Sequence, residues 1–539
     1  MATGEGTLAE VVERWATRTP DKAFIVAECG ETTSFCQFFE QVCTAAGAML
    51  GAGAGHGDRI AIWAPNRLEW VVAASAAQMI GAALVPINTR FKGTEAGFVL
   101  ARTGAKLLFT TRAFLGIDYV NLLERKFGGA QEGRPIAGLP KLERIILIGD
   151  DRATSGVIDW QGFNSIVPAP DELGRARALV NPDTIADILF TSGTTGEPKG
   201  AMHSHAQAIW GASNINDANG LRADDRMLVV NPFFHSFGYR AGWCAALLAG
   251  MTLYPMAVFD PVAISALVER ERITVLMGPP TLFEDLLAAQ QRDPRDLSSL
   301  RIGHTGASSS AADMIRRART ELGYDALLTS YGMTETSALV TSNRVGDSLE
   351  TITTTVGKAV PGVELRTIDG KGRDLGPSEA GELLVRGPNV MKGYLDDPAA
   401  TAAAIDAAGW LHTGDVAMIL ESGHVRIIDR LKDVVIVGGF NVYPAEVERV
   451  LAEHPAIAEV VIVGAPDARL GEVCASCVVL RDGHSLTLAE LREWASERIA
   501  NFKVPRHLII RDALPRTALG KPQKFILKAE TAAMAKRTT

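Results

Sequence analysis

Hydrophobic and polar positions along the chain follow two different patterns, and the change comes near residue 350. In the first 190 residues, short apolar runs alternate with helical patterns such as 8–17 and 70–79. The apolar runs lie at 59–63, 83–87, 107–110 and 145–148. The alternation returns between 185 and 340. Apolar runs of strand length that alternate with helices are typical of a largely parallel sheet. The pattern therefore predicts an α/β fold with two parallel-type subdomains.

The rest of the chain divides into a β-rich stretch and a final mixed stretch. From 350 to 430 the apolar runs are short and turn residues such as Pro361-Gly362 separate them, which predicts a small β-barrel-like subdomain. The last stretch has strand patterns at 434–437 and 460–463 and helical patterns at 444–452 and 488–500. Because 539 residues exceed one ordinary core, we predict a large N-terminal domain, 1–431, and a small α+β C-terminal domain, 432–539.

Composition and charge exclude several classes of function. The formal net charge is −8, whereas a nucleic-acid-binding face needs an excess of basic residues. The longest apolar runs, such as 241–253, are too short to span a membrane, and the first six residues lack the features of a secretory signal. Six cysteines in a chain of this length indicate reduced thiols. We therefore expect a cytoplasmic protein that binds no nucleic acid and has no transmembrane segment.

One loop, at residues 191–200, has the composition of a phosphate-binding site. It follows the strand-like run 185–190, and its spacing differs from that of a Walker A loop. Glycines let backbone N–H groups approach an anion, while hydroxyls and a lysine add further donors. The candidate phosphate ligands are Thr191, Ser192, Gly193, Thr194, Thr195 and Lys199.

This loop resembles the phosphate-binding signature of the adenylate-forming superfamily, which includes acyl-CoA synthetases, peptide-synthetase adenylation domains and beetle luciferases. The superfamily carries further motifs in a fixed order, and seven more segments of this chain resemble them in that order. They are 231–238, 306–308, 331–336, 410–415, 429–433, 438–448 and 515–521. The resemblance spans almost the whole chain. It implies an ATP-dependent enzyme that activates a carboxylic acid as an acyl-adenylate and then transfers it to a thiol.

The resemblance also implies roles for the matching residues on the ATP side. Glu335 is implied as the Mg²⁺ ligand, which suits an ion that takes one or two carboxylates together with phosphate oxygens. Lys521 is implied as the catalytic lysine that neutralises charge between the substrate carboxylate and the α-phosphate. Asp415 is implied to accept from the ribose hydroxyls. The implied catalytic set is completed by His235 and Thr191, and the ATP-binding set by Gly306, Ala307, Ser308, Tyr331, Gly332, Thr334 and Arg430.

A second half-reaction requires a thiol to reach the acyl-adenylate. The resemblance implies that the C-terminal domain is mobile and rotates about a hinge at Lys432, so that Gly438 and Gly439 line a CoA tunnel. Glycines suit such a wall because a side chain would block passage. We therefore expect ATP, Mg²⁺ and coenzyme A as cofactors, with free CoA as the acceptor. A homodimer is expected by analogy with relatives.

The acyl pocket is expected from three segments around 231–244, 303–308 and 331–340. The implied residues are Phe234, His235, Phe237, Tyr239, Arg240, Gly303 and Met333. His235 is interpreted as a gate between the pocket and the thiol tunnel, with no role in proton transfer. Arg240 has three interpretations: a ligand for CoA phosphates, a contact for a polar group at the far end of the acyl chain, or an outward-facing arginine.

Two features of the sequence indicate the substrate: the absence of a pocket aspartate and the sequence of the pocket segments. His235 stands where amino-acid activators place an aspartate, so an amino acid is disfavoured. The segment 231–242, with 259–261 and 273–281, resembles CoA ligases of steroid-ring catabolism, which activate a bicyclic propanoate. The resemblance thus favours a bulky alicyclic or terpenoid acid. Three alternatives stay open: a fatty-acid or arylpropenoate CoA ligase, an acyl-AMP ligase that loads a carrier protein, and a luciferase-like or non-catalytic relative.

Overall fold

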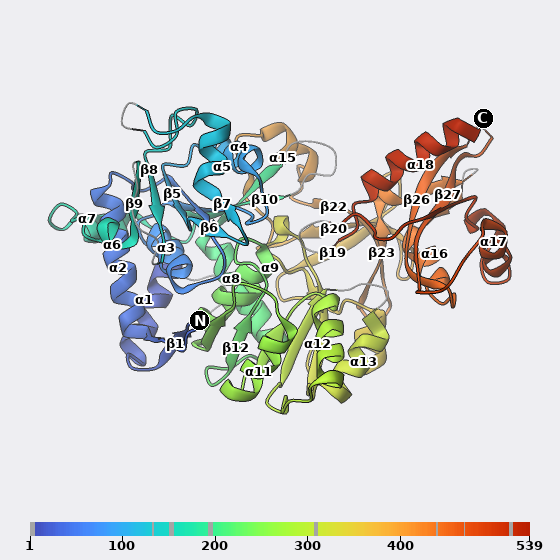
Figure 1. Ribbon diagram of the computed structural model, residues 1–539, viewed down its shortest axis with the longest axis horizontal. Coiled ribbons are helices and arrows are strands. Elements are labelled where there is room, and N and C mark those ends of the chain that lie inside the picture. Colours follow the sequence, from blue (N-terminus) through green and yellow to red (C-terminus); the bar gives the residue numbers. More distant parts are fainter. Residues whose placement is uncertain are drawn as a thin grey trace.

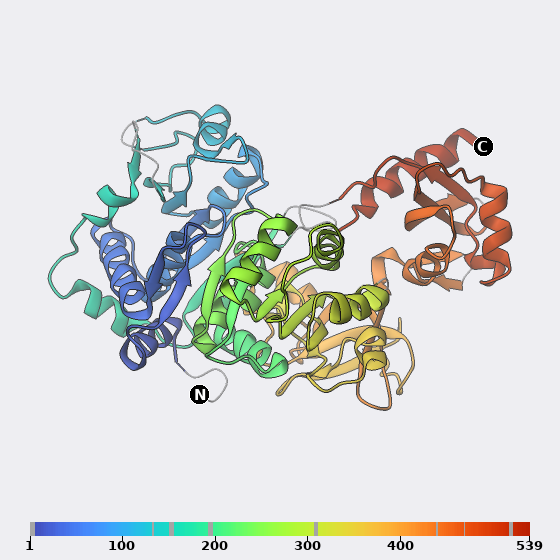
Figure 2. The same ribbon diagram turned by 60° about the horizontal axis from the view of Figure 1, so that its bottom comes forward.

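The chain folds into a large part and a small C-terminal part. The computed structural model describes residues 6–131, 134–149, 156–191, 198–306, 311–437, 440–467, 469–516 and 521–538. In Figure 1 the small part, coloured orange to red, stands beside one end of the large part, and the turned view in Figure 2 shows the same separation. Among these residues, no helix has the length and apolar character needed to cross a membrane.

The first large sheet has eight strands in the order β21-β11-β10-β4-β3-β5-β8-β9. These strands are β3 (Arg59–Trp63), β4 (Ala83–Pro86), β5 (Leu107–Thr110), β8 (Arg144–Leu147), β9 (Val157–Asp159), β10 (Ile185–Thr191), β11 (Lys199–Ser204) and β21 (Gly393–Tyr394). The strands from β10 to β9 pair in parallel, whereas β11 and β21 pair antiparallel at one edge. The parallel sheet that the apolar runs predict is therefore confirmed.

The second large sheet has nine strands in the order β18-β17-β16-β15-β14-β12-β13-β1-β2. They are β1 (Ala23–Val26), β2 (Thr32–Ser34), β12 (Arg226–Val229), β13 (Thr252–Pro255), β14 (Val275–Met277), β15 (Ile302–Gly306), β16 (Ala326–Tyr331), β17 (Thr341–Ser342) and β18 (Lys358–Ala359). The strands from β16 to β1 are parallel, and antiparallel pairs close both edges. A small hairpin joins β6 (Ala113–Phe114) to β7 (Ile117–Asp118).

Helices cover both sheets and meet between them. Every residue of α3 from Trp70 to Met79 is buried, so this helix carries no polar stripe. The likewise buried α8, which follows β11, packs against η1 and α10, which follow β12. The elements are α1 (Leu8–Arg18), α2 (Phe35–Gly51), α3 (Leu68–Met79), α4 (Gly93–Thr103), α5 (Tyr119–Phe127), α6 (Trp160–Asn164), α7 (Glu172–Leu179), α8 (His205–Asn219), α9 (Ser236–Gly238), the π-helix η1 (Tyr239–Cys244), α10 (Ala245–Ala249), α11 (Pro261–Glu271), α12 (Pro280–Arg292), α13 (Ala311–Glu321), η2 (Thr334–Thr336), α14 (Leu349–Thr354) and α15 (Pro398–Ala404).

The third part is a four-stranded antiparallel sheet in the order β19-β20-β22-β23, and its described pairings form an open sheet in place of the expected barrel. Its strands are β19 (Glu364–Ile368), β20 (Gly381–Arg386), β22 (Leu411–Ile419) and β23 (Val425–Arg430).

The small C-terminal part has its own hydrophobic core, built on five strands and three α-helices. Its elements are η3 (Leu431–Asp433), β24 (Val435–Val437), β25 (Phe440–Val442), α16 (Pro444–Leu451), β26 (Ile457–Asp467), β27 (Gly471–Leu480), α17 (Leu488–Ser496), η4 (Asn501–Lys503), β28 (His507–Ile510) and α18 (Lys524–Thr538). Cys474 and Cys477 are buried in β27 and unbonded, so this pair is a feature of a packed strand. An α/β protein with a small α+β part is confirmed.

Candidate active site

The carboxyl ends of strands from both large sheets carry the predicted ATP-side residues. Thr191 ends β10, Gly306 ends β15 and Tyr331 ends β16. In open α/β sheets, ligands bind at the carboxyl ends of parallel strands. An added Cβ at Gly306 would meet no atom within 4 Å, so this strand end faces open space.

Asp415 on β22 is held by two other predicted residues. The hydroxyl of Tyr331 donates to its Oδ2 across 2.5 Å, and Nε of Arg430 lies 2.6 Å from its Oδ1. Asp415 is only 2% exposed, and this burial raises the pKa of its carboxyl, while Arg430 acts in the opposite direction. Tyr331, which is 84 residues away in the sequence, and Arg430 on the neighbouring strand thus fix the orientation of one buried carboxylate.

Lys521, from the small C-terminal part, lies near Asp415 and Arg430. Desolvation lowers the pKa of Lys521, the nearby charge of Arg430 lowers it further, and Asp415 opposes both. Lys521 also acts on His235: desolvation and then this lysine lower the pKa of His235 to about 4, so the imidazole is neutral near pH 7. The N–H of Phe237 donates to Nδ1 of His235, so the ring proton is on Nε2. The structure therefore brings Lys521, Asp415, Arg430 and His235 together.

Glu335 occupies a second cluster beside the phosphate loop. The hydroxyl of Tyr394 donates to Oε1 of Glu335 across 2.9 Å, and the ammonium of Lys199 lies 5.2 Å from the centroid of the Tyr394 ring. A carboxylate next to the lysine that the resemblance implies to bind phosphate fits Mg²⁺, which takes most of its ligands from phosphates and water. The described residues contain no group of three or more His, Cys, Asp or Glu side chains suited to a metal.

The backbone after Tyr331 folds tightly upon itself. An added Cβ at Gly332 would lie 2.0 Å from the carbonyl oxygen of Ala338. Ser337 and Ala338 have φ values of 51° and 72°, in the left-handed region that such residues rarely adopt. Strain of this kind persists only where surrounding contacts enforce it, and it concentrates at functional sites.

The structure corrects part of the expected acyl pocket. Phe234, Phe237 and Met333 are partly exposed, as pocket residues should be. Tyr239 and Arg240 are fully buried, and Nη2 of Arg240 lies 2.6 Å from Oδ2 of Asp187 on β10. The helix directs both side chains toward the first sheet, so in this structure Arg240 neither faces outward nor offers a surface to CoA phosphates.

The structure also corrects the expected place of Gly303 in the acyl pocket. An added Cβ there would lie 2.6 Å from Cδ1 of Leu327 and 2.9 Å from Cε1 of Tyr324, so the strand face of Gly303 points into packed core. The adjacent His304 points to the other face, where its ring contacts Phe237 with centroids 6.5 Å apart.

Several predicted residues lie outside the described part of the chain. They are Ser192, Gly193, Thr194, Thr195, Ala307, Ser308, Gly438 and Gly439. The predicted hinge residue, Lys432, is exposed in η3 immediately after β23. The sequence analysis missed Tyr394 and Asp187. Asp187 could have been noticed as a charged residue inside the apolar run 185–190, whereas Tyr394 carries no comparable signal.

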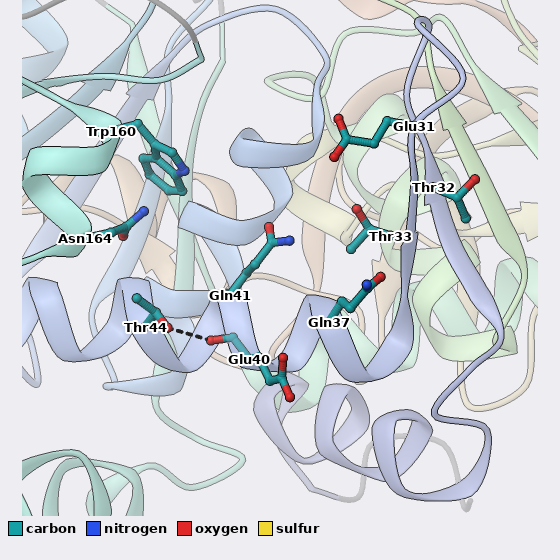
Figure 3. A pocket seen from close by; sticks show the side chains of 9 residues that line it. All are labelled: Glu31, Thr32, Thr33, Gln37, Glu40, Gln41, Thr44, Trp160 and Asn164. Atoms are coloured by element: carbon teal, nitrogen blue, oxygen red, sulfur yellow. Dashed lines mark hydrogen bonds between the residues drawn. The ribbon is translucent and has the colours of Figure 1, made fainter.

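A separate hollow of about 390 Å³ opens between α2, the β2 strand and α6 (Figure 3). Its lining is polar and includes Glu31, Glu40 and Trp160. None of its residues belongs to the clusters around Asp415 or Glu335, so we do not assign it to the acyl group.

Two family matches cover most of the chain. Residues 12–395 match the family described as AMP-binding enzyme, and residues 446–521 match the AMP-binding enzyme C-terminal domain. Two curated relatives carry the name 3-[(3aS,4S,7aS)-7a-methyl-1,5-dioxo-octahydro-1H-inden-4-yl]propanoyl:CoA ligase. The protein from Rhodococcus jostii is 43% identical over 94% of this chain and 95% of its own. The protein from Mycobacterium tuberculosis is 44% identical over 96% of this chain and 97% of its own.

Solved structures agree with these matches. The anthranilate CoA ligase AuaEII, in complex with anthranoyl-AMP, superimposes with a TM-score of 0.86 at 25% identity, over 99% of this chain and 98% of its own. ATP-bound MatB from Rhodopseudomonas palustris has a TM-score of 0.80 at 28% identity, over 97% and 98% of the two chains. The chain belongs to the AMP-binding enzyme family, and within it to the AMP-forming acyl-CoA synthetases.

Proposed function

We propose that this enzyme joins a bicyclic alicyclic propanoate, of the dioxo-hydrindane class, to coenzyme A. The observation that carries the proposal is the identity of 43% and 44%, over nearly the full length, to two ligases named for such a substrate. The partly exposed apolar side chains of Phe234, Phe237 and Met333 suit a bulky hydrocarbon ring system. The substrate is activated as acyl-AMP with release of pyrophosphate, and acyl-CoA and AMP then form.

In the first half-reaction the protein supplies positive charge and orientation. Lys199 and the loop from Thr191 bind the phosphates, and Asp415 accepts from the ribose hydroxyls. Mg²⁺ held at Glu335 would supply further neutralisation of phosphate charge. Lys521 lies between the carboxylate and the α-phosphate and stabilises the charge that develops as the new bond forms. The neutral His235 closes the acyl side and excludes water.

In the second half-reaction the small domain turns about Lys432 and admits CoA. The domain boundary between residues 431 and 432 is part of this proposal, and it is supported by the fact that the buried apolar residues up to Val425 and those from Val435 onward belong to separate clusters. The two glycines at 438 and 439 are assigned to the CoA side by the family resemblance alone. We place the reaction in the cytoplasm, where ATP and CoA are available.

The test is AMP formation with ATP, Mg²⁺ and a panel of acids, with and without CoA. The panel contains the dioxo-hydrindane propanoate, a diterpenoid acid, fatty acids of several lengths and a cinnamate. The proposal expects the highest kcat/KM with the hydrindane acid and a strict requirement for CoA in turnover. A preference for fatty acids or cinnamates refutes the substrate assignment, and pyrophosphate release without any thioester refutes CoA as the acceptor.

A further inference from the structure

Asp187 is a fully buried carboxylate at the centre of a charged cluster. It lies in β10, four residues before Thr191, and both of its oxygens are used. Oδ2 accepts from Nη2 of Arg240 at 2.6 Å and from the hydroxyl of Tyr239 at 3.1 Å. Burial by itself would raise the pKa of Asp187, but Arg240 and then His203 outweigh it, so the pKa lies below its usual value and the group is charged.

His203 connects this carboxylate to the segment that carries Glu335. Nδ1 of His203 lies 3.1 Å from Oδ1 of Asp187, and Nε2 lies 2.8 Å from the carbonyl oxygen of Thr334. A carboxylate oxygen and a backbone carbonyl can only accept, so in either hydrogen bond the ring nitrogen is the donor. His203 is fully buried in β11 (Lys199–Ser204).

Arg240 connects the same carboxylate to the acyl side. It lies in η1, which follows the pocket segment 231–238, and its guanidinium stacks 4.2 Å from the centroid of the Tyr239 ring. Arg240 therefore links a helix that follows β12 of the second sheet to Asp187 in β10 of the first sheet. One carboxylate therefore joins the strands that flank the phosphate loop, the pocket helix and the Thr334–Glu335 segment.

We propose that Asp187 and His203 are positioning residues for adenylation, which hold the Thr334 carbonyl and thereby place Glu335 beside the phosphates. The segment needs such a restraint, because Ser337 and Ala338 are strained and Gly332 is pressed against Ala338. The proposal rests on the proposed function only in requiring adenylation, and it is independent of which acid is used. Partners behind a catalytic or metal-binding side chain are needed to keep it in a productive orientation.

Two variants of His203 separate its two hydrogen bonds. In His203→Gln the side-chain amide nitrogen takes the place of Nε2 and can still donate to Thr334, whereas in His203→Asn it takes the place of Nδ1 and can donate only to Asp187. The proposal expects His203→Asn to lower kcat/KM for MgATP in ATP–pyrophosphate exchange by about 10- to 100-fold, with the KM of the acid nearly unchanged. His203→Gln should recover most of that loss.

A matched control measures the purely structural effect. Asp225 is 1% exposed and pairs with Arg301 at 2.6 Å, but it lies at the opposite, amino end of β12. Both Asp187→Asn and Asp225→Asn should lower Tm, Asp187→Asn by more because Arg240 is fully buried while the side chain of Arg301 is 22% exposed, but only Asp187→Asn should raise KM for MgATP. Equal kinetic losses in the two aspartate variants, or in the two His203 variants, would overturn the proposal.

A measurement that needs no substrate tests the positioning role independently of which acid the enzyme uses. Hydrogen–deuterium exchange of peptides covering 331–339 should quicken in His203→Asn and Asp187→Asn, and should remain as in the unmodified protein in His203→Gln and Asp225→Asn. Unchanged exchange in His203→Asn contradicts the positioning role even if every acid in the panel fails. Failure of the panel alone, with the expected exchange pattern, refutes only the proposed substrate.

Discussion

The hydroxyl of Tyr394 donates to Oε1 of Glu335 across 2.9 Å, and the same ring lies beside the ammonium of Lys199. Tyr394 belongs to β21, which pairs with β11 through Ala201 and Met202. The tyrosine thus reaches the site from a segment almost two hundred residues beyond the phosphate loop. It fixes one oxygen of Glu335, the residue that we propose holds Mg²⁺.

Replacing Tyr394 by phenylalanine should raise the Mg²⁺ concentration that adenylation requires, without unfolding the protein. The ring and its contact with Lys199 remain, but the hydrogen bond to Glu335 is lost. We expect the Mg²⁺ concentration for half-maximal pyrophosphate exchange to rise about tenfold. Tm should stay close to that of the unmodified enzyme; an unchanged Mg²⁺ requirement would show that the contact is dispensable.

Lys521→Ala should separate the two half-reactions. Removing a group that stabilises charge in the transition state typically costs about 10²- to 10³-fold in kcat. We expect a loss of that size in acyl-AMP formation, whereas transfer of a preformed acyl-adenylate to CoA should stay near its original rate. Rapid-quench assays of each half-reaction provide the measurement, and Lys528→Ala on α18 is the matched control.

Asp187→Asn should be strongly destabilising, because it leaves the buried charge of Arg240 unpaired. Breaking a buried ion pair from one side typically costs about 3–5 kcal/mol in the free energy of unfolding. The double variant Asp187→Asn/Arg240→Met removes both charges and should regain part of that loss. Urea unfolding of the four proteins in the cycle gives the coupling energy; additive losses would contradict the pairing.

Buried histidines should make the protein less stable in mild acid. Burial lowers the pKa of His205 and of His304 from 6.5 to about 4. Below pH 6.5 the two histidines bind protons in the unfolded chain but stay neutral in the folded chain. The contribution of these histidines to stability is therefore present above pH 6.5 and is lost as the pH falls toward 4. Each histidine should add up to about 1.4 kcal/mol per pH unit to the slope of the unfolding free energy in this window.

His304→Gln tests this dependence. The amide can replace the contact that Nε2 of His304 makes with Ser330, at 2.6 Å, but it does not titrate. Unfolding free energy measured between pH 7 and 5 should fall less steeply in this variant. Equal slopes in His304→Gln and in the unmodified protein would rule out the linkage.

Gly332→Ala should disable the site through backbone displacement. The new Cβ would lie 2.0 Å from the carbonyl oxygen of Ala338. Because the backbone fixes the positions of both atoms, a side-chain rotation cannot relieve the clash. We expect a large rise in KM for ATP together with a lower Tm. Gly370→Ala, at a turn where an added Cβ would meet nothing within 4 Å, should change neither.

Local patterns allowed much of this fold to be predicted. The apolar runs 59–63 and 107–110 have the same bounds as β3 and β5, because a strand buried on both faces is apolar over nearly all of its length; the polar residues in these two strands, Arg59 and Thr110, stand at their ends. The motif residues Asp415, Arg430 and Lys521 lie together, as the resemblance implied. The same motifs could not indicate which side of a helix Arg240 uses.

The missed features depend on tertiary pairing. Asp187 in β10 and Arg240 in the helix η1 are 53 residues apart, so no periodicity relates them. His203 follows the phosphate loop, but its role depends on Thr334, which is 131 residues away. Such partners become visible only when the two sheets are placed against each other. A charged residue inside an apolar strand was the one available signal.

The short strand β21 also sets an order for biosynthesis. Until residues 393 and 394 have left the ribosome, β11 has β10 on one side and no strand on the other, and the backbone N–H groups of Lys392 and Leu395 have not yet reached Met202 and Gly200. An unpaired strand edge is a template for intermolecular association. Nascent chains that stall before residue 393 should therefore depend on chaperones, and the phosphate-binding strand pair gains its last neighbour only when nearly three quarters of the protein has been made.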